Sequence, residues 1–157
     1  MSMGGYYAPR IAAFEDRYNA CLTWGAHFDY HEVWVHRRKV LESGGTISSS
    51  AMWQLPWVLG TPDMDSAMEK CKDYTLAGVA EKIQIPIMIT HGQDDNIVPV
   101  EMAHRLYEAC GSKEKALKIF TVEDGGSQHC VVDNLSMASN WISDWWMDRF
   151  GTKDILN

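Results

Sequence analysis

Positive charge is scarce in this sequence, paired cysteine motifs and long apolar runs are absent from it, and each of these features excludes a class of protein. Lysine and arginine total 14 against 21 aspartate and glutamate residues, so the formal net charge is −7. Because clustered cations are needed to neutralise phosphates, we expect neither nucleic acid nor an anionic membrane surface as a partner. No apolar run approaches the roughly 20 residues that cross a bilayer, and the first residues do not resemble a signal peptide. These absences predict a soluble protein of the cytoplasm.

The cysteine content gives no framework for disulfides or zinc. The four cysteines are scattered and form no C-x-x-C pair, at Cys21, Cys71, Cys110 and Cys130. We therefore interpret them as reduced thiols. His27, His31 and Glu32 come nearest to a metal-binding cluster, but they lack the ligand spacing of a zinc site. The sequence predicts neither a metal nor a cofactor.

What the chain does contain fits one globular domain, or part of one. Of its 157 residues, 46% are hydrophobic and 22% are charged, which is ordinary for a folded domain. Apolar residues recur at helical spacing or in short β-branched runs, and the two patterns alternate, as is typical of a parallel α/β sheet. The patterns predict strands at 18–24, 83–90 and 116–122 and helices at 3–15, 31–43, 61–72, 99–110 and 132–150.

The helical segments cluster in the first half of the chain. Residues 31–80 contain several short helical patterns and no strand pattern, so we expect them to form a helical cap inserted into the sheet-containing part. Residues 1–30 and 81–157 would then form the α/β core.

The first residues carry a candidate nucleophile. Ser2 stands before Met3 and Gly4, as in the second half of a G-x-S-x-G elbow, in which a tight strand-to-helix turn holds the serine hydroxyl out. The helical pattern that follows would direct its positive end and free N–H groups at Ser2. Gly4 is the residue expected to let the backbone pass closely. The same short motif is also typical of a leftover tag, so it needs support from elsewhere in the chain.

Two later loops supply that support. Residues 91–99 read H-G-Q-D-D-N-I-V-P and resemble the H-G-x-x-D-x-x-V-P segment that carries the triad acid of α/β hydrolases; the spacing from His91 favours Asp95 over Asp94. The loop at 125–129 resembles the one that delivers the catalytic histidine in that superfamily. The order serine, aspartate, histidine is also the order of that fold. The resemblance implies the C-terminal part of an α/β-hydrolase fold, with about three parallel strands, flanking helices and the cap.

The resemblance implies a role for each of these residues. Ser2 would be the nucleophile, His129 the base that takes its proton, and Asp95 the carboxylate that orients and stabilises the imidazole. The backbone N–H of Met3 would supply one donor of the oxyanion hole. In the family the other donor comes from a loop after the third strand, and this sequence has no counterpart of that loop.

A narrower resemblance implies a substrate class. Residues 2–10, the Trp24-Gly25 pair and the helical insertion resemble a subgroup that contains fungal hydrolases shortening polyketide chains in pigment synthesis, a 2,6-dihydroxypseudooxynicotine hydrolase and the fermentation-respiration switch protein. That subgroup implies hydrolysis of a carbon-carbon bond beside a ketone, or of an ester or lactone, in an aromatic or polyketide-like small molecule. Some members carry an auxiliary acid soon after the sixth strand, matched best here by Glu32, with Asp29 second.

Tryptophan and methionine residues between positions 24 and 68 suit an apolar ligand cavity, although a hydrophobic core uses the same residue types. The candidates for substrate binding, which would equally serve as cap core, are Trp24, Met52, Trp53 and Trp57.

The complete fold has five strands before its serine, and the sequence shows none of them. We therefore expect a C-terminal fragment that is poorly active or inactive alone, because its first strand would expose an unpaired edge. Such a fragment would need the missing N-terminal half, a homodimer partner, or both. The alternative is a catalytically inactive remnant that serves as an interaction module.

Overall fold

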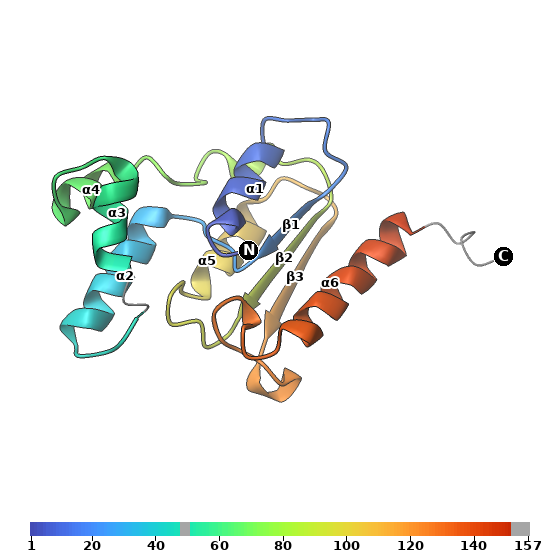
Figure 1. Ribbon diagram of the computed structural model, residues 1–157. Coiled ribbons are helices and arrows are strands. Elements are labelled where there is room, and N and C mark those ends of the chain that lie inside the picture. The colour runs from blue at the N-terminus through green and yellow to red at the C-terminus, as the bar shows by residue number, and fades with distance from the viewer. Residues whose placement is uncertain (48–50, 152–157) are drawn as a thin grey trace.

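Within residues 1–47 and 51–151, which the computed structural model describes apart from the side chains of Ala51 and Met52, three strands form one parallel sheet. The strands are β1 (Cys21–Trp24), β2 (Ile87–Gly92) and β3 (Lys115–Phe120), in the order β1-β2-β3 (Figure 1). β2 lies in the centre and is buried at all six positions, because a strand with neighbours on both sides and helices on both faces has no solvent-facing row. The parallel α/β sheet expected from the sequence is confirmed.

Helices cover both faces of this sheet. α1 (Gly4–Ala12) and α5 (Glu101–Ala109) pack on one face, and α6 (Leu135–Phe150) lies on the other (Figure 1). None of the helices in the described ranges is both long and apolar enough to span a bilayer.

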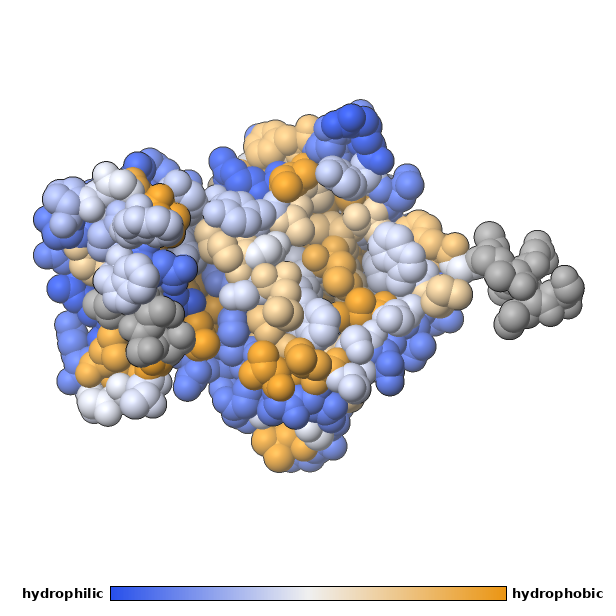
Figure 2. Space-filling view, viewed as in Figure 1, coloured by the Kyte–Doolittle hydropathy of each residue, from blue (hydrophilic) through white to orange (hydrophobic). Residues whose placement is uncertain are grey.

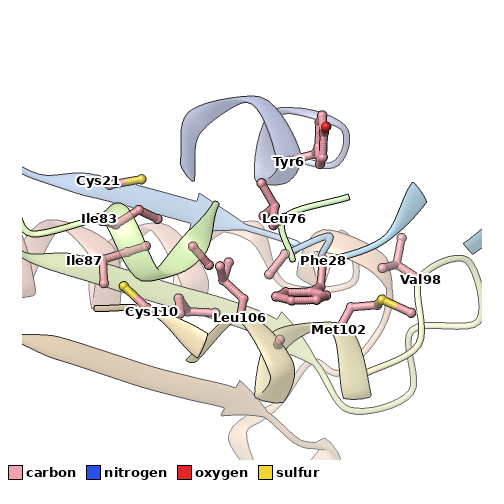
Figure 3. Packing of buried hydrophobic residues seen from close by; sticks show 14 of the residues in the cluster. Tyr6, Cys21, Phe28, Leu76, Ile83, Ile87, Val98, Met102, Leu106 and Cys110 are labelled. Carbon is pink, nitrogen blue, oxygen red and sulfur yellow. The ribbon is translucent and has the colours of Figure 1, made fainter. Parts of the chain in front are cut away.

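The main hydrophobic core fills the space between the sheet and α1 and α5. Figure 3 shows Tyr6 of α1, Ile87 of β2 and Leu106 of α5 in one cluster, and each of these side chains is at most 2% exposed. A smaller cluster on the opposite face joins Phe120 of β3 to Ala138 of α6. Because burial of an aliphatic or aromatic side chain contributes roughly 1.5–3 kcal/mol, these two clusters hold the helices on the sheet.

Three further helices pack on one another beside the sheet: α2 (Tyr30–Glu42), α3 (Ala51–Leu59) and α4 (Met64–Cys71) (Figure 1). Asp29 and Asp63 begin α2 and α4, since each carboxylate accepts a hydrogen bond from the backbone N–H three residues later. The helices share a separate buried cluster made of Trp34, Leu55, Ala67, Met68 and Cys71. The division of the chain into a core at 1–30 and 81–157 and a cap at 31–80 stays a prediction.

The last helix begins later than the sequence predicts. Cys130 and Val131 have φ angles of 52° and 49°, and they belong to a single 3-10 turn, His129–Val131. Residues with positive φ cannot continue an α-helix. α6 therefore begins at Leu135, where the Asn134 side chain accepts a hydrogen bond from the backbone N–H of Met137.

Pro9 is the sixth residue of α1, beyond the first turn in which a proline costs no helical hydrogen bond. A proline there leaves the carbonyl four residues earlier without its helical donor. That carbonyl belongs to Gly5, and it accepts a hydrogen bond from the backbone N–H of His27 instead, at 3.4 Å. The proline therefore helps to attach α1 to the segment that follows β1.

Candidate active site

Ser2 occupies a tight turn between the end of β1 and the start of α1. Its φ is 51°, a left-handed conformation that is costly for a residue other than glycine and persists only where neighbouring contacts enforce it. The Ser2 N–H donates to the carbonyl of Trp24 at 2.8 Å, and its own carbonyl accepts from the N–H of Gly5 at 2.6 Å. These bonds fix the strained backbone of the turn at Ser2, a conformation like the one that the sequence motif predicts.

The glycine that permits this close packing is Gly5, and not Gly4 as the sequence suggested. A Cβ on Gly5 would overlap the carbonyl of Gly25, whereas a Cβ on Gly4 would meet no atom within 4 Å. Gly25 itself has φ 79°, and a Cβ there would lie 2.7 Å from the Cys130 sulfur. The close packing around the turn at Ser2 thus depends on two glycines, Gly5 and Gly25, and involves the loop that carries His129.

His129 and Asp95 continue from Ser2 in one chain of hydrogen bonds. The Nε2 atom of His129 lies 2.9 Å from the Ser2 hydroxyl oxygen, and its Nδ1 lies 2.6 Å from Oδ2 of Asp95. The other carboxylate oxygen of Asp95 accepts from the backbone N–H groups of Ile97 and Val98, both at 2.9 Å. The carboxylate is therefore fixed on both oxygens and aimed at the imidazole.

Asp94, the alternative acid, points elsewhere. Its Oδ2 accepts a hydrogen bond from the Ser127 hydroxyl at 2.7 Å. The structure thus brings together Ser2, Asp95 and His129 and leaves Asp94 outside that chain.

In this series of hydrogen bonds, His129 and Asp95 are the two groups that can carry charge. Burial lowers the pKa of His129, but the hydrogen bonds to Asp95 and Cys130 and the negative charge of Asp95 together outweigh burial, so the pKa is raised to about 9. Burial likewise opposes ionisation of Asp95, yet the hydrogen bond and charge of His129 and the backbone N–H of Val98 together hold the pKa of that carboxyl below its usual range. Each partner favours the charged form of the other, which suits an imidazole that must gain a proton during reaction.

His91 supports Asp95 from behind. It is completely buried, its Nδ1 accepts from the backbone N–H of Ala26 at 3.1 Å, and its Nε2 donates to the carbonyl of Val98 at 2.9 Å. Burial lowers the pKa of His91, so the ring stays neutral in this tautomer. It connects the segment after β1 to the loop that carries Asp95, as a structural residue does.

Cys130, which the sequence marks only as a scattered cysteine, lies beside the imidazole. Its sulfur is 3.4 Å from Nε2 of His129 and 3.5 Å from the carbonyl oxygen of Trp24. The side chain is 1% exposed. Cys130 therefore packs the loop that carries His129 against the end of β1, next to the turn at Ser2.

A cavity of about 460 Å³ opens beside Ser2, between the sheet and the α2–α4 helices. Its wall includes Ser2 and Met3 and, from the neighbouring segments, His27, Tyr30, Trp34, Arg37 and Tyr74. The last five residues were not predicted from sequence. The sequence does contain one signal that could have placed two of them together: Trp34 and Arg37 are three residues apart, and residues at that spacing share one face of a helix.

His27 is a neutral residue of this wall. It is 1% exposed, and its Nδ1–H donates to the Gly25 carbonyl at 3.1 Å. Burial lowers the pKa of His27 to about 3. The ring therefore carries no charge near neutral pH.

The tryptophans expected to bind substrate do not line the cavity. Trp24 packs on the opposite face of the sheet, against the cluster that contains Phe120, and Trp53 and Trp57 are 66% and 76% exposed. The side chain of Met52 lies outside the described part of the chain.

The two acids expected near the sixth strand also have other partners. Glu32 is at the surface, where it accepts from Arg105 at 2.6 Å, and it is not part of the cavity wall. Asp29 begins α2 by accepting from the N–H of Glu32.

Met3 precedes the first residue of α1, and its backbone N–H donates to no acceptor among the residues described. That donor is free to meet an oxygen beside Ser2, where the positive end of α1 also lies. Across the described ranges, no three histidine, cysteine, aspartate or glutamate side chains come together as metal ligands would.

Comparisons with known proteins bear on the fold of the chain. Residues 63–122 match the hydrolase family described as Serine aminopeptidase, S33. No curated protein gives a significant sequence match. The structure is similar to the crystal structure of 2,6-dihydroxy-pseudo-oxynicotine hydrolase, with a TM-score of 0.74 and 24% identity over 94% of this chain and 38% of that one.

Two other solved structures have a similar fold. AbyA5 gives a TM-score of 0.72 at 15% identity, over 94% of this chain and 40% of its own. The monoacylglycerol lipase of Paleococcus ferrophilus gives a TM-score of 0.56 at 19% identity, over 94% of this chain and 66% of its own. The chain spans about two fifths of the length of the first two proteins. It therefore has the fold of the C-terminal part of an α/β hydrolase, which confirms the fold class expected from the sequence.

Proposed function

We propose that this chain carries the nucleophile, base and acid of a serine hydrolase. The observation that supports the proposal is the continuous chain of hydrogen bonds from Asp95 through His129 to Ser2, which ends at the wall of a cavity. A serine hydroxyl is a weak nucleophile at neutral pH, so it needs a base within hydrogen-bond distance and an acid that orients that base.

The reaction follows from these positions. The Ser2 hydroxyl attacks a carbonyl carbon of the substrate while Nε2 of His129 takes its proton, and Asp95 stabilises the imidazolium that forms. The carbonyl oxygen becomes an oxyanion, which the N–H of Met3 and the positive end of α1 stabilise. When the oxyanion collapses, the bond between the carbonyl carbon and the leaving group breaks, an acyl ester remains on Ser2, and the imidazolium gives its proton to the departing alkoxide or to the carbanion beside a ketone. Water then attacks the acyl ester while Nε2 of His129 takes its proton, and that proton passes to the Ser2 oxygen as the acid product leaves.

The proposed substrate is an aromatic or polyketide-like small molecule cleaved at a carbon-carbon bond beside a ketone, or at an ester or lactone. Support comes from the aromatic wall formed by Tyr30, Trp34 and Tyr74, since rings bind well against other rings. It comes also from the similarity to a structure named as a 2,6-dihydroxy-pseudo-oxynicotine hydrolase.

The proposal includes a larger assembly. β1 is an edge strand of the sheet, and a groove of about 260 Å³ runs beside it, lined by residues of α1, of β1 and of the segment between them that include Ile11, Leu22 and Tyr18. Figure 2 shows apolar residues gathered on this face, between α1 and α6. An exposed strand edge with an apolar border is prone to pair with another strand. We propose that an N-terminal half or a second copy covers it and supplies the second oxyanion donor.

The proposal also places the enzyme in the cytoplasm. All four cysteines are buried as free thiols, a state that reducing compartments maintain.

A fluorophosphonate probe tests the proposal directly, because it modifies only an activated serine. We expect the full chain, alone or mixed with an N-terminal half, to be labelled, and Ser2→Ala and His129→Ala to lose the label. Ser139→Ala, which changes a serine of α6, is the matched control and should label like the wild type. If no label is incorporated even with the N-terminal half present, the chain is a non-catalytic remnant or an interaction module.

A further inference from the structure

The cavity beside Ser2 contains one formal charge, and it is positive. Arg37 of α2 is the only ionised residue among those described on the cavity wall, and no aspartate or glutamate accompanies it there. The chain as a whole has a net charge of −7. The cavity is therefore positive against the balance of the molecule, which favours a ligand of opposite charge.

Contacts hold the Arg37 guanidinium in place without neutralising it. Its Nε donates to the carbonyl of Ile97 at 3.3 Å, and its central carbon lies 4.7 Å from the ring centre of Trp34. A guanidinium has five N–H donors in a planar fork, so most of them are uncommitted.

Other arginines of the cap and its border do have ionic partners. Arg38, the next residue in α2, lies 2.8 Å from a carboxylate oxygen of Asp65. Arg105 lies 2.6 Å from Glu32. Arg37 has no carboxylate oxygen within 4.0 Å among the residues that the structure describes.

The absence of a partner has an energetic consequence. Burial lowers the pKa of Arg37, and Tyr30 and Asp95 offset only part of that effect. An arginine nonetheless stays protonated in proteins. A partly buried cation without a paired anion is unfavourable, and an anionic ligand that reaches it recovers that cost.

We propose that Arg37 binds an anionic oxygen of the substrate, a carboxylate or an ionised phenol or enol, while the aromatic part of the substrate lies against Tyr30 and Trp34. Arg37 is thus a specificity-determining residue that favours anionic aryl or acyl ketones over neutral ones. The inference rests on the proposed function in one respect, since it takes the cavity beside Ser2 as the substrate site.

Binding to a chain that cannot turn substrate over tests the inference. Calorimetric titrations of the full-length Ser2→Ala chain would compare 4-acetylbenzoate with its neutral isostere 4-acetylbenzamide, and 4-hydroxyacetophenone below and above the pH at which its phenol ionises. We expect at least tenfold tighter binding of the carboxylate than of the amide. Tighter binding of the phenol only after ionisation would identify phenolate as a second source of the same anionic oxygen.

Variants of two adjacent arginines then assign the effect. Arg37→Gln in the same background should weaken binding of 4-acetylbenzoate by about tenfold to a hundredfold, as expected for loss of a hydrogen bond to a charged group, and should leave the amide unchanged. Arg37→Lys keeps the charge and should retain part of the preference. Arg38→Gln, the matched control, should bind both probes like the parent chain.

Several outcomes would overturn the inference. They are equal affinity for carboxylate and amide in the parent chain, binding of neither probe, and a preference that survives Arg37→Gln. The parent-chain comparison remains decisive if Arg37→Gln fails to fold. Fluorophosphonate labelling of the wild-type chain separates the two proposals: labelling without a charge preference refutes the role of Arg37 alone, and a charge preference without labelling refutes the hydrolase alone.

Discussion

Replacing Asp95 by asparagine should lower the pKa of His129, because the substitution removes the negative charge next to its Nδ1. Asparagine keeps an oxygen for the backbone N–H groups of Ile97 and Val98, so the loop should stay in place. Its amide nitrogen would then face Nδ1 of His129 in place of the oxygen now 2.6 Å away. An amide that donates to Nδ1 favours the tautomer with the proton on Nε2, which cannot accept a proton from Ser2.

The size of the effect follows from the environment of the ring. The pKa of His129 should fall from about 9 to 6.5 or below, and at about 1.4 kcal/mol for each pKa unit the lost stabilisation of the imidazolium is about 3 kcal/mol. In the proposed mechanism the wild-type imidazole acts as the base only when it is neutral, so fluorophosphonate labelling of Ser2 should accelerate as the pH rises toward 9. Labelling of Asp95→Asn should be slower at every pH.

A two-dimensional NMR titration of the imidazole carbon-bound protons, assigned with a His129→Gln variant, measures the pKa without any turnover. Asp94→Asn is the matched control, since Asp94 contacts Ser127 and not the imidazole, and its His129 should titrate as in the wild type. The reasoning is refuted if wild-type His129 titrates near 6.5, or if its pKa is the same in Asp95→Asn.

Three further predictions concern stability and binding. Burial holds the pKa of His27 at about 3, well below the 6.5 of an exposed histidine. Above pH 6.5 the ring is therefore neutral in both the folded and the unfolded chain, and it does not make stability depend on pH. Stability should then fall as the pH drops and the unfolded state takes up the proton; urea unfolding at decreasing pH should show a smaller loss for His27→Gln. Gly5→Ala should lower the free energy of unfolding by about 2 kcal/mol or more, because its Cβ overlaps the Gly25 carbonyl, whereas Gly4→Ala should raise it by about 0.5 kcal/mol; urea denaturation of the pair decides. Trp57→Ala should not change calorimetric binding of 4-acetylbenzoate to the Ser2→Ala chain, since Trp57 is 76% exposed and outside the cavity.

The sheet could be predicted because its signals are local. The run from 85 to 89 is short, apolar and rich in isoleucine, and its last three residues form the first half of β2. The later start of α6 could not be predicted, because Cys130 and Val131 adopt positive φ. Valine is among the residues least suited to that conformation, so only contacts made by the folded loop can impose it.

The convergence of Ser2, Asp95 and His129 was accessible from sequence for a related reason. Asp95 follows β2 and His129 follows β3, and the carboxyl ends of parallel strands lie at one edge of a sheet. Ser2 comes before β1 in the chain, so its place at that edge was expected only from the resemblance of its motif to a nucleophile elbow. The roles given to these residues remain proposals.

The cavity wall was not accessible in the same way. α3 is apolar at every position except Gln54, so its sequence has no periodic pattern to tell which residues face inward. The sequence therefore does not distinguish Trp53 and Trp57 from Leu55 as candidates for burial, yet Leu55 is buried and both tryptophans are exposed. Which face of α3 is buried depends on the packing of α4 against it, and a single sequence does not contain that information.

The hydrogen bond between Ser2 and His129 joins residues 127 positions apart in the chain. Closing so long a loop costs entropy that local helices do not, so contacts of this separation form late in folding. After dilution from urea, helical circular dichroism should recover before the reactivity of Ser2. A partially unfolded chain would retain most of its helix and have a chemically inert serine, so the reactivity of Ser2 reports on completion of the whole tertiary structure.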